Sequence, residues 1–77
     1  VNETELNAFT AVSGSGPAYV FLLIESMVEA ATKLGLKEAQ ATDFVSQTVH
    51  GAAVLLKESG LSARALREKV TSPAGTT

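Results

Sequence analysis

The chain has 77 residues and carries six Lys and Arg against eight Asp and Glu, a formal net charge of −2. This length allows one domain, residues 1–77, whose own core is marginal. Because the sequence holds no cysteine and one histidine, a disulfide scaffold and a thiolate or histidine-cluster metal site are excluded. The acidic balance disfavours nucleic acid and anionic membrane as partners. We expect a cytoplasmic protein from a reducing compartment.

Helical periodicity predicts a first helix over about residues 3–12, with Asn2 as its N-cap. The run 13–16, Ser-Gly-Ser-Gly, predicts a break, and the proline that follows it is typical of a first helical position. A second helix is predicted over 17–34, ended by Gly35. This part of the chain therefore predicts two helices joined by a glycine turn.

The first half of that second helix, Ala18 to Ile24, is an apolar run of seven residues. A helix that is apolar on all sides is buried or lies in an interface. The run is too short to span a bilayer, and a chain of this size cannot cover it alone. We therefore expect these residues to lie in a contact between subunits.

A third helix is predicted over 37–59 with Gly60 after it, and a short fourth helix over 63–70 with Ser62 as its N-cap. No run alternates with a period of two for long enough to predict a strand. The expected fold class is all-α, with two long helices and short flanking helices.

Several groups of residues are candidate sites. The Ser13–Pro17 turn and the loop Ser72–Thr77 are each either anion-binding turns or ordinary connections. Glu25 and Glu29 suit acid–base chemistry or a metal, but a solvated face paired with Lys33 is the simpler interpretation. His50 is expected at a surface or interface, and Tyr19 is expected to pack with its hydroxyl hydrogen-bonded.

Taken in order, four segments resemble the pyrroline-5-carboxylate reductase family. They are Thr10–Tyr19 (TAVSGSGPAY), Lys33–Leu36, Gln47–Ala53 (QTVHGAA) and Leu66–Thr77 (LREKVTSPAGTT). The resemblance covers the chain from about Leu6 onward, and Ala74 stands where the family usually has a second glycine. It implies the family's helical dimerisation domain, of the type found at the C-terminus of 6-phosphogluconate dehydrogenase. The family's N-terminal dinucleotide-binding domain and its final helices have no counterpart in these residues.

The resemblance implies reduction of the cyclic imine 1-pyrroline-5-carboxylate to L-proline with NADPH or NADH, in proline biosynthesis. It assigns Ser72, Gly75 and Thr76 to the substrate carboxylate, and Thr77 to the ring nitrogen as the catalytic hydroxyl. The cofactor would be bound mainly by the missing domain, and no residue here is assigned to a cofactor or a metal.

The resemblance also implies a homodimer or a higher homo-oligomer acting on a small molecule, with no nucleic acid or membrane partner. By itself the chain would supply the dimer interface and the substrate loop and would be inactive. One alternative is a free-standing helical oligomerisation module without catalysis. A second is a helix-turn-helix regulator, which the acidic balance disfavours.

Overall fold

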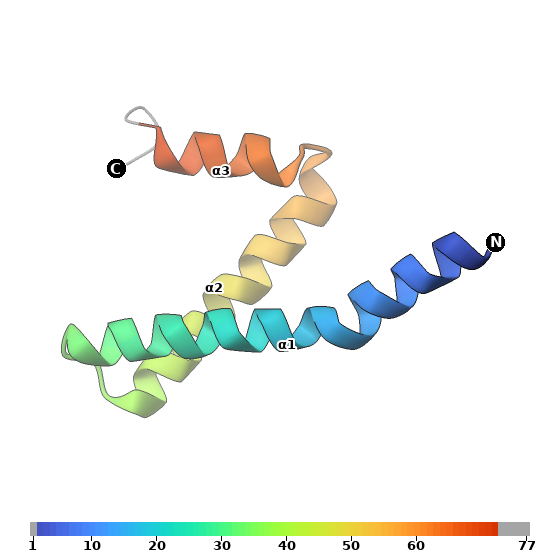
Figure 1. Ribbon diagram of the computed structural model, residues 1–77. Coiled ribbons are helices and arrows are strands. Elements are labelled where there is room, and N and C mark those ends of the chain that lie inside the picture. Colours follow the sequence, from blue (N-terminus) through green and yellow to red (C-terminus); the bar gives the residue numbers. More distant parts are fainter. Residues whose placement is uncertain (1, 73–77) are drawn as a thin grey trace. The chain divides into compact units, whose positions relative to one another are not determined.

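The computed structural model describes residues 2–72, in which three helices and no strand are present. They are α1 (Glu3–Lys33), α2 (Glu38–Ser59) and α3 (Ala63–Thr71) (Figure 1). The all-α prediction is confirmed. The chain divides into two units, residues 1–46 and 47–77. The first holds α1 and the start of α2, and the second holds the rest of α2 and α3.

The predicted caps form as the sequence indicates. The Asn2 side chain accepts a hydrogen bond of 2.8 Å from the N–H of Glu5, and the Ser62 hydroxyl accepts one of 3.0 Å from the N–H of Ala65. Each bond satisfies an N–H at a helix start that has no partner within the helix. The predicted starts of α1 and α3 are thereby confirmed.

Both predicted stop glycines adopt the left-handed conformation, with φ of 114° at Gly35 and 73° at Gly60. After α1, the N–H of Leu36 donates to the carbonyl of Ala31 at 3.1 Å, and the N–H of Gly35 donates to that of Thr32 at 3.0 Å. This bond pair is the Schellman ending, which turns the chain out of the helix and pairs the last carbonyls. It positions α2 to begin at Glu38, one residue later than predicted.

The predicted break at residues 13–16 is wrong, because α1 runs through it as one helix with Pro17 inside. The hydroxyls of Thr10 and Ser13 donate to the carbonyls of Leu6 and Phe9, at 2.9 and 2.7 Å. Ser13 therefore bonds back into the helix it continues and does not cap a new one.

What remains of the expected break is a bend. Figure 1 shows α1 changing direction where its colour passes from blue to cyan. Pro17 has no N–H for the carbonyl four residues earlier, and its ring crowds that carbonyl. The helix accommodates the proline by bending and keeps Gly14 and Gly16 at negative φ.

The core of the described chain is small. Within residues 2–72, Ala41 and Val45 are the buried hydrophobic residues, and both belong to the start of α2 in the first unit. The larger apolar side chains Phe44, Leu55 and Leu56 of the same helix are exposed. Two buried side chains do not offset the conformational entropy of ordering helices of this length.

Candidate functional site

Ser72 is the one predicted site residue that lies within the described part of the chain. It ends α3, where its N–H donates to the carbonyl of Glu68 at 2.9 Å and its hydroxyl donates to the carbonyl of Lys69 at 3.2 Å. Its backbone, with φ of −72° and ψ of 151°, is extended, so the chain leaves the helix at this point. The other assigned residues, Gly75, Thr76 and Thr77, lie outside the described residues.

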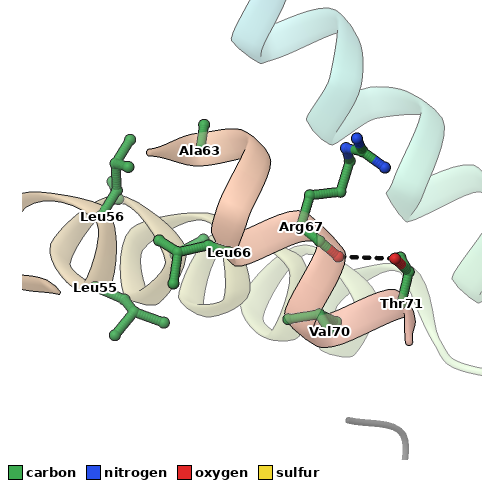
Figure 2. Close-up of a pocket in the computed structure, with 9 residues that line it drawn as sticks. Leu55, Leu56, Ala63, Leu66, Arg67, Val70 and Thr71 are labelled. Atoms are coloured by element: carbon green, nitrogen blue, oxygen red, sulfur yellow. Dashed lines mark hydrogen bonds between the residues drawn. The ribbon is translucent and has the colours of Figure 1, made fainter. Parts of the chain in front are cut away.

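The hydroxyls at the end of α3 are engaged with their own helix. Thr71 donates to the carbonyl of Arg67 at 2.8 Å, one turn earlier (Figure 2). The Ser72 hydroxyl donates to the carbonyl of Lys69, three residues earlier, through a longer bond. Because a hydroxyl has one proton, Ser72 must release Lys69 before it can donate to a carboxylate. This 3.2 Å bond is longer than the roughly 2.5–3.0 Å usual for a hydroxyl donor.

Beside Ser72 lies an apolar groove of about 430 Å³ within the second unit, called here the α2–α3 groove. Figure 2 shows Leu66 projecting from α3 toward Leu55 and Leu56 of α2, while the Arg67 guanidinium points away from these leucines. The lining consists of Ala52, Ala53, Leu55, Leu56, Ala63, Leu66, Arg67, Val70 and Thr71. With one charged residue and one hydroxyl among nine, the groove suits an apolar side-chain cluster better than a charged small molecule.

In the first unit, the apolar surface of α1 is uncovered. Phe21 is 67% exposed, and Val20 and Leu23 are also exposed. Phe21 borders two shallow hollows. One is lined by Val12, Gly16, Pro17, Val20 and Phe21, and the other by Ala18, Phe21, Leu22, Ile24, Glu25, Val28 and Thr42. The apolar run of residues 18–24, which the sequence predicts to lie in a subunit contact, is therefore largely exposed within a single chain.

The remaining candidates do not form a site among the described residues. The Glu29 carboxylate pairs with the Lys33 ammonium at 3.3 Å, and both side chains are largely exposed. His50 and Tyr19 are exposed, so any packing of Tyr19 needs another surface. No group of three or more metal-binding side chains exists within residues 2–72. The Ser13–Pro17 segment is helical, so it forms no anion-binding turn.

By length and composition alone, α1 is able to cross a membrane. Its most apolar stretch of 18 residues has a mean hydropathy of 1.3, and none of that stretch is buried. A helix that packs between protein subunits has the same composition. The carboxylates of Glu25 and Glu29 lie on its second half, where a bilayer would make them costly. The expectation that the chain has no membrane partner stays a prediction.

Comparisons with known proteins agree on one family. The family described as "Pyrroline-5-carboxylate reductase dimerisation" matches residues 3–77. Pyrroline-5-carboxylate reductase 2 of Bacillus subtilis is 48% identical over 77 residues, covering 100% of this chain and 28% of that protein. The pyrroline-5-carboxylate reductase of Pseudomonas aeruginosa is 49% identical over 76 residues, covering 99% of this chain and 28% of that protein.

A solved structure shares the arrangement. The crystal structure of Plasmodium falciparum pyrroline carboxylate reductase with NADP bound aligns with a TM-score of 0.85 and 37% identity. The alignment covers 99% of this chain and 31% of that chain. The present chain thus spans less than a third of the length of each of these relatives.

Proposed function

This chain belongs to the pyrroline-5-carboxylate reductase dimerisation family, and on that premise we propose that it is the helical dimerisation domain of an oxidoreductase. The enzyme reduces 1-pyrroline-5-carboxylate to L-proline with NADPH or NADH and acts in the cytoplasm. The observation that carries the proposal is the family match over residues 3–77, supported by relatives that share nearly half of the residues across the whole chain.

The domain's first task is to join two subunits. The apolar residues of α1 are exposed, and only two small or medium side chains are buried among the described residues. Folding and association must then occur together, because the surface that stabilises each copy is supplied by the other. A homodimer, or a higher homo-oligomer, removes this apolar surface from water.

The domain's second task is to hold the substrate. Ser72 stands at the end of α3, and the segment 72–77 predicted to hold the substrate starts there. Its hydroxyl, with the backbone around Gly75 and Thr76, is suited to a carboxylate, and the Thr77 hydroxyl to the ring nitrogen of the imine. Holding the carboxylate orients the ring, so that a hydroxyl beside the nitrogen can donate a hydrogen bond or relay a proton.

The nicotinamide cofactor is bound outside the described residues. A dinucleotide site needs a glycine-rich turn between a strand and a helix, and residues 2–72 contain no strand. The glycines of α1 lie inside a continuous helix, whose N–H groups are directed along the helix axis and bonded within it. The described residues therefore offer no such turn, and we expect the chain to be inactive by itself.

The test compares the 77-residue chain with the intact protein that carries it. Oxidation of NADPH or NADH with 1-pyrroline-5-carboxylate is followed by absorbance, and mass in solution by sedimentation. We expect a dimer or larger for both, and imine-dependent oxidation for the intact protein alone. An intact protein that associates but does not oxidise the cofactor contradicts the proposed activity. An intact protein that is monomeric contradicts the proposed dimerisation.

A further inference from the structure

Among the described residues, two apolar surfaces are exposed within their own unit. One is the α2–α3 groove of the second unit, where Leu55 and Val70 are exposed. The other is a stripe on the first turns of α1 formed by Leu6, Phe9 and Val12, called here the leading stripe. These three side chains are 58%, 62% and 72% exposed. Their spacing of three residues places them along one side of the helix, the pattern of a helix that docks in a groove.

The charges around the two surfaces are opposite. Of the eight acidic and six basic side chains, residues 1–46 carry six acidic and two basic, a net charge of −4. Residues 47–77 carry the other two acidic and four basic, a net charge of +2. The leading stripe is flanked by Glu3 and Glu5 with no basic residue before Lys33. Helix α3 carries Arg64, Arg67 and Lys69 against one acidic residue, Glu68, whose carboxylate lies 3.9 Å from the Arg64 guanidinium.

We propose that the leading stripe of one copy fills the α2–α3 groove of a second copy. This inference rests on the proposed dimerisation and states which surfaces meet. In a twofold dimer each contact occurs twice, so one pairing covers both exposed surfaces of both copies. Opposite charges at the rim favour this pairing and disfavour stripe against stripe, which would bring four glutamates together.

The pairing has a consequence for the substrate loop. Helix α3 has nine residues, which is too short to be stable without packing. Leu66 and Val70 form its side of the groove, and Ser72 follows directly at its end. A stripe seated in the groove holds α3 against α2, and so fixes where the loop begins. Dimerisation then completes the substrate site through the partner's leading stripe.

The test uses cross-linking between copies, since these 77 residues contain no cysteine. The intact protein is prepared with any cysteine outside them replaced by serine. A size-tagged Phe9→Cys protein is mixed and reannealed with an untagged Leu66→Cys or Val70→Cys protein, and a short thiol-specific cross-linker is added. The matched control is Ala11→Cys, two residues further along α1 and about 200° around the helix from Phe9.

We expect a tagged–untagged product with Phe9→Cys and little or none with Ala11→Cys. Two results overturn the pairing. The first is a dimer by sedimentation with no such product for either groove variant, which leaves the proposed dimerisation intact. The second is a Phe9→Cys/Leu66→Cys double variant that links only within one chain when diluted into excess unmodified protein. A monomer by sedimentation overturns the proposed dimerisation as well.

A kinetic measurement tests the link to the loop. Phe9→Ala truncates the centre of the stripe and should raise the dimer dissociation constant roughly 30-fold or more, as a buried aromatic anchor does. At concentrations where the variant remains dimeric, we expect a raised KM for 1-pyrroline-5-carboxylate and an unchanged KM for NADPH. Equal changes in both constants, or none, contradict the link between the groove and the substrate loop.

Discussion

Replacing Phe21 by alanine tests whether a partner subunit covers this side chain in the dimer or whether it stays in water. Phe21 is 67% exposed in the chain and borders both hollows of α1. A phenylalanine offers about 200 Å², so about 130 Å² remains for a partner to cover. At roughly 25 cal/mol per Å² that burial stabilises by about 3 kcal/mol per copy, of which alanine retains a part. We expect a loss of about 2–3 kcal/mol per copy.

Because a twofold dimer contains Phe21 twice, Phe21→Ala should weaken it by about 4–6 kcal/mol in total. The dissociation constant would rise by roughly three to four orders of magnitude. Sedimentation over a range of protein concentrations measures this change directly. The control is Gln47→Ala, an exposed polar position of α2, which should change little. Were Phe21 to stay in water in the assembly, Phe21→Ala would cost no more than the control, and the interface argument would be refuted.

The remaining predictions concern the helices and the loop. Gly14→Ala should stabilise α1 by about 0.5–1 kcal/mol in urea unfolding, because a Cβ there meets nothing within 4 Å; destabilisation would show that the assembled domain needs the glycine. Ser62→Ala should cost about 1 kcal/mol by the same method, because the cap on α3 is lost, and Ser62→Asn should restore it. In the intact enzyme, Ser72→Ala should raise mainly the KM for the imine. Thr77→Ala should lower kcat by roughly 10²-fold if its hydroxyl relays a proton, and an unchanged kcat would remove Thr77 from the mechanism.

Helix boundaries that depend on local chemistry could be predicted from the sequence. Asn2 and Ser62 cap because their side chains reach an N–H three residues later. Gly35 and Gly60 end helices because a left-handed residue costs glycine little. These interactions lie within one turn of the chain, so the residues that decide them are adjacent in sequence.

The continuity of α1 could not be predicted from the same local rules. Two glycines and a proline within four residues favour a break by intrinsic propensity. The structure instead shows the hydroxyls of Thr10 and Ser13 bonded back to helix carbonyls, an arrangement that often accompanies a bent helix. A hydroxyl before a glycine run is compatible both with capping a new helix and with continuing the old one. The sequence does not decide between these two uses.

The predicted substrate site stays largely a prediction, since Ser72 is its one described residue.

The core shows what a hydrophobic pattern cannot predict. On α2, burial extends over Ala41 and Val45 and leaves Leu55 and Leu56 exposed. Periodicity states which side of a helix is apolar, and it does not state whose residues cover that side. Because the family is described by dimerisation, we expect the covering residues to belong to a second molecule. The same hydrophobic pattern then encodes both the fold and the assembly, and a substitution in it should change both together.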